Sequence, residues 1–279
     1  MKRILVPTDF SKEANNAFLA ACSLAREVTA DILLLHVIED PHGDSFRTMG
    51  VGGYDPMDNV YIIKLVEKTK ERLQSIVNDP QFSDINVTYK IDIGNSYSSI
   101  IEHISSHKSS LIVMGTKGVS GLEEILVGSV TDKVVRYATC PVITVKHCKN
   151  LAGMKNIVFA TDLKEDQLSI IEDLKKMQKF YGAKLHIIKV YDSIWLREDE
   201  VEKRIKEFAD LVQLENYTIE VAKDSDEAEA IMHYAHKIDA DMIAMGAHDR
   251  HGLMHLIAAH VIKEVINQAH RPIWTKAIR

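Results

Sequence analysis

The chain has 279 residues, of which 46% are hydrophobic and 27% are charged, and its formal net charge is −6. This length suits two domains of about 140 residues, and the composition is that of a globular protein. Both halves are acidic, with 16 basic against 18 acidic residues up to Asn150 and 18 against 22 after it. A nucleic-acid phosphate backbone is therefore not expected to be the main ligand.

Cysteine usage and hydropathy indicate the compartment. Cys22, Cys140 and Cys148 form neither a CxxC pair nor an even disulfide framework, which fits a reducing environment. No apolar run approaches the roughly 20 residues that span a bilayer. The first residues lead directly into a strand pattern, without the apolar region of a signal peptide. We expect a soluble, cytoplasmic protein with no membrane partner.

Short apolar runs alternate with segments of helical period through the first half. The predicted strands are, in chain order, Ile4–Pro7, Ile32–Val37, Val87–Ile93, Leu111–Met114 and Val142–Val145. The predicted helices are Ala14–Val28, Ile62–Ile76, Ser96–His107 and Ser129–Ala138. Most of the strands are almost wholly apolar, so the sheet is predicted to be parallel and buried on both faces. Alternation of this kind is typical of a doubly wound α/β fold.

Segments of the first half recur in the second, so the chain is predicted to contain one unit twice. The recurring pairs are Arg3–Phe10 with Asn156–Leu163, Leu111–Gly115 with Met242–Gly246, and Cys140–Ile143 with Arg271–Trp274. The first pair is 153 residues apart and the other two are 131 apart. We attribute this difference of 22 residues to the Gly- and Asp-rich stretch Asp40–Asn59.

The second unit is predicted to repeat the order of the first. Its strands are expected near Ile157, Leu185, Ile219, Ile243 and Ile273. The linker is expected from Lys146 to Lys155, which places the two domains at residues 1–148 and 154–279.

Two features of the first unit are placed to bind a ligand, because ligands of open α/β sheets lie beyond the carboxyl ends of the strands. Asp9 ends the first strand, and its carboxylate suits ribose hydroxyls or an adenine edge. The fourth strand ends in Gly115-Thr116-Lys117-Gly118, and Gly128-Ser129 then opens a helix. Glycines allow close approach of the backbone, and a helix start offers unpaired amides to an anion. This pattern predicts phosphate binding.

The pattern Gly115-x2-Gly118-x9-Gly128-Ser129, followed by Cys140-Pro141-Val142, resembles the nucleotide motif of ATP-binding universal stress proteins. Pro7-Thr8-Asp9-Phe10-Ser11 resembles that family's opening, and Leu35-His36-Val37 resembles its second strand. The resemblance covers essentially the whole chain as two family domains. It implies a five-stranded, Rossmann-like sheet in each domain and edge-strand pairing between them, which makes an internal pseudo-dimer.

The resemblance also implies the ligand and its contacts. The adenine and ribose are expected at Pro7, Thr8, Asp9 and Val37, and the ribose and phosphates at Met114, Gly115, Gly118, Gly128, Ser129 and Val130. The expected ligand is ATP, with AMP or ADP as alternatives, and Mg²⁺ can accompany the triphosphate. The chain is thus interpreted as a regulatory, stress-response nucleotide-binding protein. A homodimer beyond the internal pseudo-dimer is left open.

No catalytic residue is assigned. The motif contains neither Walker A Gly-x4-Gly-Lys-Ser/Thr nor an obvious water-orienting base, so slow ATP hydrolysis is the most that we expect. One alternative is a nucleotide-transferring enzyme of a related α/β type, although the His-x-Gly-His and Ser-Gly-Gly-x-Asp-Ser signatures are missing. Another is an interaction scaffold whose second domain binds a small molecule other than a nucleotide.

The second unit departs from the nucleotide motif. A shift of 131 residues places Asp249 at the position of Gly118, Ala259 at that of Gly128 and His260 at that of Ser129. A carboxylate repels a triphosphate, and side chains replace two close-approach glycines. The second site is predicted to be empty or to bind something other than ATP.

Two further stretches have no assigned role. His248, His251, His255 and His260 form a cluster in which residues 247–258 are expected to be a loop. No acidic or cysteine partner completes a metal motif, so no metal site is expected; a response of the second site to pH is the weaker hypothesis. Pro41–Asn59 is interpreted either as a mobile cover over the nucleotide or as a disordered segment.

Overall fold

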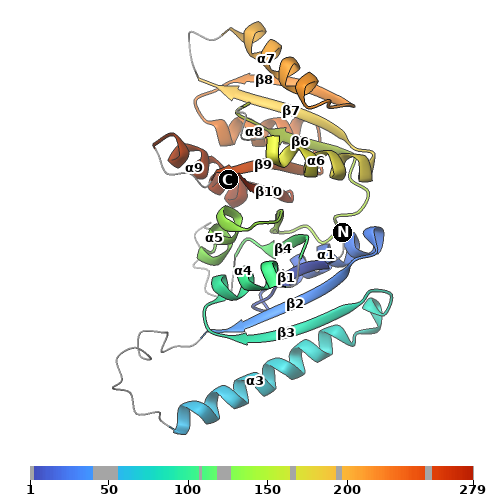
Figure 1. Cartoon of the computed structure of the whole chain (residues 1–279), viewed down its shortest axis with the longest axis vertical. Helices are drawn as coiled ribbons and strands as arrows, with labels where there is room; N and C mark the ends of the chain where they lie inside the picture. Colours follow the sequence, from blue (N-terminus) through green and yellow to red (C-terminus); the bar gives the residue numbers. More distant parts are fainter. Residues whose placement is uncertain are drawn as a thin grey trace.

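The computed structural model describes residues 3–39, 56–106, 109–117, 127–163, 168–192, 197–248 and 253–278. Two units of alternating strands and helices follow one another along the long axis of the molecule (Figure 1). They share one ten-stranded sheet with the order β3-β2-β1-β4-β5-β10-β9-β6-β7-β8. The predicted α/β fold with five strands in each unit is confirmed.

The elements of the first unit match the apolar runs of the sequence. Its strands are β1 (Arg3–Pro7), β2 (Asp31–Ile38), β3 (Val87–Ile93), β4 (Leu111–Gly115) and β5 (Val142–Val145). Its helices are α1 (Lys12–Val28), α3 (Pro56–Val77), α4 (Ser96–Ser106) and α5 (Ser129–Tyr137), with a 3-10 turn at Pro80–Phe82.

The second unit has the same order of elements. Its strands are β6 (Asn156–Ala160), β7 (Lys184–Tyr191), β8 (Tyr217–Lys223), β9 (Met242–His248) and β10 (Ile273–Ile278). Its helices are α6 (Leu168–Tyr181), α7 (Glu198–Leu211), α8 (Glu227–Lys237) and α9 (Leu253–Gln268).

Every pairing within a unit is parallel, and the two units join through an antiparallel pairing of β5 with β10. The centre of this junction is Ile143 opposite Trp274, and both side chains are buried. In the first unit, β1 pairs with β2 on one side and with β4 on the other. The strand order therefore reverses at β1, and this is the point at which a doubly wound sheet opens a crevice.

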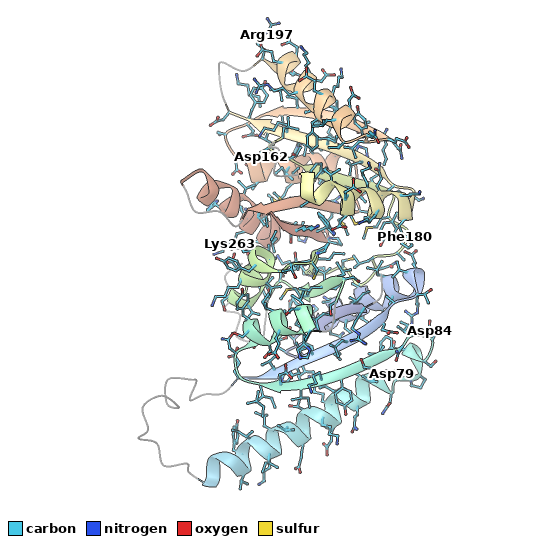
Figure 2. All side chains as sticks on the ribbon, viewed as in Figure 1. Asp79, Asp84, Asp162, Phe180, Arg197 and Lys263 are labelled. Carbon is cyan, nitrogen blue, oxygen red and sulfur yellow. The ribbon has the colours of Figure 1, made fainter. Side chains whose placement is uncertain are left out.

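Helices cover both faces of the sheet, and Figure 2 shows side chains filling the space between the helices and the strands. One buried cluster combines the inner faces of α1, α6 and α7 with one face of the sheet. A second cluster combines α4, α5, α8 and α9 with the other face. Each cluster contains residues of both units, so the two units share their cores. No helix in the described part of the chain is both long and apolar enough to cross a bilayer.

The connection between β5 and β6 is packed into the structure. Leu151 is 0% exposed and Met154 is 3% exposed, and both belong to the cluster on the α1 face. The Leu151 N–H donates to Ser23 Oγ on α1 at 2.7 Å, and the Tyr181 hydroxyl on α6 donates to the Leu151 carbonyl at 2.7 Å. Burial raises the pKa of Tyr181 far above its usual range, so this hydroxyl remains a donor. The predicted linker therefore clamps α1 to α6.

The difference in spacing between the units has several sources, and its attribution to Asp40–Asn59 alone was wrong. The connection between β2 and α3 spans residues 39–55, whereas residues 192–197 connect β7 to α7. In addition, α3 has 22 residues and α7 has 14. The helix expected over Ile62–Ile76 already begins at Pro56, a residue favoured in the first helical turn. Of the stretch Pro41–Asn59, residues 41–55 lie outside the described residues.

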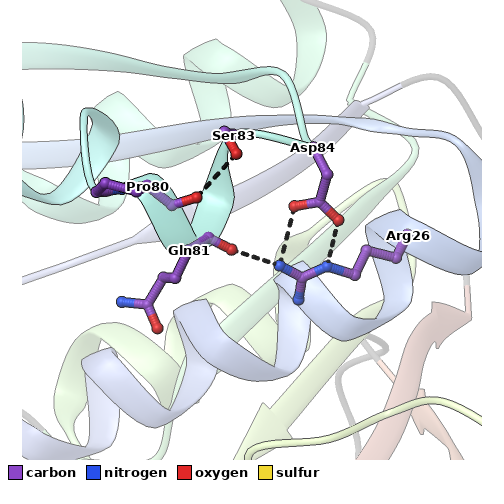
Figure 3. Close-up of polar contacts among 5 residues, drawn as sticks. All are labelled: Arg26, Pro80, Gln81, Ser83 and Asp84. Atoms are coloured by element: carbon purple, nitrogen blue, oxygen red, sulfur yellow. Dashed lines mark hydrogen bonds and ion pairs between the residues drawn. The ribbon is translucent and has the colours of Figure 1, made fainter.

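The turn between α3 and β3 is held to α1 by Arg26, as Figure 3 shows. The Arg26 guanidinium donates to both carboxylate oxygens of Asp84, at 2.7 and 3.1 Å, and to the carbonyl of Gln81 at 2.8 Å. These side chains are about half exposed, with 41% of Arg26 and 54% of Asp84 accessible. An exposed pair of this kind orders the turn but contributes little to the free energy of folding, because water screens the charges.

Candidate functional site

The polar residues of the first unit meet at the carboxyl edge of the sheet. Pro7 is the last residue of β1 and lies opposite Leu35 of β2. The Thr8 N–H continues this ladder by donating to the Leu35 carbonyl at 2.8 Å. Asp9 follows directly, so its half-buried side chain lies at the point where the strand order reverses.

The turn after β1 is held by its own side chains. Thr8 Oγ1 accepts the Phe10 N–H at 3.1 Å, and Asp9 Oδ1 accepts the Ser11 N–H at 3.0 Å. Ser11 then caps α1 by accepting the Ala14 N–H at 3.1 Å. Phe10 adopts a left-handed backbone with φ of 64°. Asp9 therefore has a structural role in this turn as well as a place at the edge of the site.

His36 braces the same turn from β2, a role that sequence reasoning missed. Its Nδ1–H donates to the Thr8 carbonyl at 2.8 Å, because a carbonyl oxygen only accepts. Its ring lies 4.6 Å from the ring of Phe10, centroid to centroid. Burial lowers the pKa of His36, against the opposing effects of the Thr8 hydrogen bond and the Asp9 carboxylate. The imidazole is therefore a neutral structural brace near pH 7.

Gly115 is required by the packing of α1. A Cβ atom at this position would lie 2.8 Å from the carbonyl carbon of Glu13 and 3.0 Å from the amide nitrogen of Ala14, both in the backbone of α1. The Gly115 carbonyl also accepts the Thr131 hydroxyl of α5 at 3.0 Å. The absent side chain thus lets the first turn of α1 approach the end of β4, while the carbonyl of the same residue binds the first turn of α5.

The first turn of α5 presents backbone amides without a side-chain cap. Gly128 is the N-cap residue and makes no side-chain cap hydrogen bond, and the Asp132 N–H donates to its carbonyl at 3.0 Å. The amides of Ser129, Val130 and Thr131 precede that first helical bond. We expected the Gly128 N–H to be available to an anion, but it already donates to the Thr116 carbonyl at 2.9 Å. The donors suited to an anion are therefore the amides that follow Gly128.

Thr116 is a second residue that the sequence analysis did not place in the site. Its backbone is fixed on both sides, since its N–H donates to the Val145 carbonyl at 3.2 Å and its carbonyl accepts from Gly128. Its side chain is 4% exposed, and among the described residues Oγ1 has no hydrogen-bond partner. A buried hydroxyl without a partner is unfavourable, so this atom marks a polar position beside the α5 N-terminus.

Nine of the ten predicted site residues lie in the described part of the chain. Pro7, Thr8 and Asp9 lie at the end of β1, while Val37 of β2 and Met114 of β4 pack with the cluster on the α4 and α5 face. Gly115 ends β4, and Gly128, Ser129 and Val130 form the start of α5. Gly118 lies outside the described residues. The fold therefore brings the ends of three adjacent strands to the carboxyl edge from which α5 begins.

The second unit keeps the first half of this arrangement. The Thr161 N–H donates to the Ile188 carbonyl at 3.1 Å, and Thr161 Oγ1 accepts the Leu163 N–H at 3.0 Å. Leu163 has a left-handed φ of 62°, like Phe10 in the first unit. The turn after the first strand is thus nearly identical in the two units.

In the second unit no helix begins at the position that corresponds to the start of α5. The expectation of a loop over residues 247–258 was wrong, because β9 extends to His248 and α9 begins at Leu253. His260, the counterpart of Ser129, lies seven residues inside α9, where each N–H donates to the carbonyl four residues earlier. The His260 side chain is exposed, with Nδ1 3.4 Å from Glu264 Oε2. Asp249 and His251 lie outside the described residues, as do the side chains of His248, His255 and Ala259.

Comparison with known proteins agrees with the two-unit architecture. The model of the universal stress protein family matches residues 1–146 and 153–275. Two universal stress proteins of Methanocaldococcus jannaschii are 31% and 30% identical over 153 and 148 residues, covering 52% and 53% of this chain and 94% and 84% of those proteins. The crystal structure of a universal stress protein from Archaeoglobus fulgidus covers 99% of this chain and 96% of its own, with a TM-score of 0.75 and 22% identity. The curated relatives thus correspond to one unit, and the solved structure shares the fold of both.

Proposed function

The chain belongs to the universal stress protein family, with two such domains in tandem, and from that premise we propose that it binds one ATP molecule, in its first domain only. AMP or ADP would occupy the same place with fewer phosphate contacts. The observation that carries this proposal is the uncapped start of α5, which lies at the carboxyl edge where β1 and β4 meet.

The chemistry of the residues at this edge fits a nucleotide. The amides of Ser129 and Val130, together with the positive end of the α5 dipole, suit phosphate oxygens. The Asp9 carboxylate suits ribose hydroxyls or the adenine edge, since it accepts hydrogen bonds and repels phosphate. Val37, which is partly buried, provides apolar surface near the end of β2. Mg²⁺ would be held mainly by the phosphates.

The second domain is proposed not to bind ATP, for a reason that concerns backbone conformation. An anion site of this type needs amides that precede the first helical hydrogen bond. At the corresponding position of the second domain, α9 is already continuous, so the amide of His260 is committed within the helix. The second domain therefore lacks both the two glycines and a helix start at this position.

We propose further a regulatory role in a cytoplasmic stress response, a proposal that rests on membership of the family. Among the described residues, the groups at the edge are backbone amides, the hydroxyls of Thr116 and Ser129, a carboxylate already engaged in its own turn, and apolar side chains. Such groups hold and orient a nucleotide, whereas rapid hydrolysis needs a group that orients water at the γ-phosphate. Bound ATP would tie the β1 turn to the start of α5 and thereby stabilise one arrangement of the first domain.

Exchanging Ser129 for glutamate tests the phosphate position. We expect Ser129→Glu to weaken ATP binding by about 100-fold or more, because its carboxylate would lie within a few ångströms of the phosphates. The fold should be retained, since an acidic residue in the first turn of a helix is favourable. The measurement is titration of the full chain with ATP by isothermal calorimetry.

The matched control is His260→Glu, which introduces the same residue at the corresponding, exposed position of the second domain. Its ATP affinity should equal that of the unaltered chain within about twofold, because exposed substitutions away from a site have small effects. Equal affinities in the unaltered chain and in Ser129→Glu would show that the phosphates do not bind at the start of α5. A loss in His260→Glu instead would move the site to the second domain.

A further inference from the structure

The two domains meet between α5 and α9, next to the proposed phosphate position. Helix α5 packs on β9 and β10 of the second domain as well as on β5 of its own. One hollow at this junction is lined by Val127, Asp132 and Val135 of the first domain and by Lys263 and Ile266 of the second. Its volume is about 10 Å³, no more than one water molecule needs, so α5 and α9 almost touch. Figure 2 labels Lys263 where the two helices meet.

The hollow is lined by corresponding residues of the two domains. The shift of 131 residues takes Asp132 to Lys263 and Val135 to Ile266, and both members of each pair contribute to the lining. As in a two-fold interface, Lys263 therefore faces α5 as Asp132 faces α9. The charges are unequal, because an ammonium group of the second domain faces the helix that starts at the proposed nucleotide site. In return, α9 faces a carboxylate.

Lys263 lies beside the start of α5. Val127 directly precedes the N-cap residue Gly128, and Asp132 belongs to the first turn of the helix. Because both line the same hollow as Lys263, this hollow runs alongside the amides that are proposed to bind phosphate. Lysine carries its charge on a flexible four-carbon stem, and Lys263 is partly exposed. Its ammonium group can therefore turn from the hollow toward the end of α5.

The cations of α5 itself are engaged elsewhere. The Arg136 guanidinium donates to Asp132 Oδ1 from Nε at 3.2 Å and from Nη2 at 3.0 Å. Arg136 also lies about 10 Å along the helix from its first residue. The Lys133 ammonium lies 6.0 Å from the centroid of an aromatic ring of α4. Among the described residues of α5 and α9, Lys263 is therefore the cation best placed to move to a phosphate.

We propose that Lys263 of the second domain contacts the terminal phosphates of a nucleotide bound by the first domain. This inference rests on the proposed nucleotide site, and it gives the second domain a part in ATP binding although its own site is not intact. The attraction between the ammonium group and the ligand grows with the number of phosphates, so Lys263 should favour ATP over AMP. Because the side chain is partly exposed, salt should weaken its contribution.

The test is calorimetric titration of the full chain with ATP and with AMP. At about 50 mM NaCl, we expect Lys263→Gln to weaken ATP binding about fivefold and AMP binding by less than about twofold. At about 500 mM NaCl, the loss of ATP affinity should shrink to less than about twofold. Lys263→Arg keeps the charge and should bind ATP within about twofold of the unaltered chain.

His260→Glu is the matched control, because it makes the net charge more negative by the same amount on the same helix. Its exposed side chain lies outside the lining of the hollow, so ATP affinity should again change by less than about twofold. The inference is overturned if the unaltered chain binds ATP and Lys263→Gln binds it as tightly, or loses ATP and AMP affinity equally. In either case the nucleotide site of the first domain stands. No ATP binding by the unaltered chain would overturn the proposed function and this inference with it.

Discussion

Gly115→Val is expected to lower the free energy of unfolding by about 3 kcal/mol, at the upper end of what overpacking costs. The first added atom would lie 2.8 Å from the backbone of Glu13, so the clash is with a helix rather than with a flexible side chain. We expect α1 to shift away from β4. Because Ser11 and the turn at Asp9 are continuous with α1, ATP affinity should fall as well.

The control for Gly115→Val is Gly182→Ala. Gly182 has a positive φ of 62°, and no atom lies within 4 Å of its Cβ position. The alanine variant should therefore lose only about 1 kcal/mol from backbone strain and keep its ATP affinity. Urea unfolding of both variants, followed by circular dichroism, measures the difference. Equal stabilities of the two variants would contradict the close approach of α1 to β4.

Leu151→Ala is expected to destabilise the whole chain by about 3 kcal/mol, within the range for leucine-to-alanine changes in cores. The side chain is fully buried between α1 and α6, although it lies in the connection between the two units. Because both buried clusters contain residues from both units, we expect one cooperative unfolding transition that moves to lower urea concentration. The measurement is urea unfolding monitored by tryptophan fluorescence and by circular dichroism.

Lys149→Ala provides the comparison within the same connection, since Lys149 is exposed. It should change the free energy of unfolding by no more than about 0.5 kcal/mol. If Leu151→Ala were equally mild, or if the unaltered chain unfolded in two separate transitions, the connection would be a tether and not a clamp.

The strands could be predicted from the sequence because each is a short apolar run between polar turns. Val87–Ile93 and Val142–Val145 have the predicted bounds, and β1, β2 and β4 differ by one residue at one or both ends. Helix starts were less predictable. Pro56 lies in a region with no apolar period, so α3 was expected to begin later, although proline at a first helical turn is itself a start signal.

The positions of some candidate residues in the fold could be predicted from the sequence, while their contacts with a nucleotide stay a prediction. Asp9, Gly128 and Ser129 lie where their types and spacing placed them, at a strand end and at a helix start. The reason for Gly115 could not be read from the sequence, because it depends on the backbone of α1, about a hundred residues earlier in the chain. The partnerless hydroxyl of Thr116 likewise appears only once its neighbours are placed.

The early start of α9 has a sequence signal that the expectation of a loop overlooked. The stretch Leu253–Ile262 contains no glycine or proline, and Ala259 replaces the glycine that ends the corresponding loop of the first unit. Without a residue that favours a break, a helix extends as far as its hydrogen bonds allow. With alanine in place of glycine at position 259, the second unit has neither the close-approach glycine nor a helix start at this point.

The most direct test of the central claim is the nucleotide content of the purified full chain. The protein is prepared without added nucleotide and denatured, and the released small molecules are identified and counted by mass spectrometry. A second portion of the same preparation, kept native, is titrated with ATP. We predict one adenine nucleotide per chain at saturation, lost in Ser129→Glu and retained in His260→Glu. Two nucleotides per chain would show that the second domain also binds ATP, and none at any ATP concentration would contradict nucleotide binding by this protein.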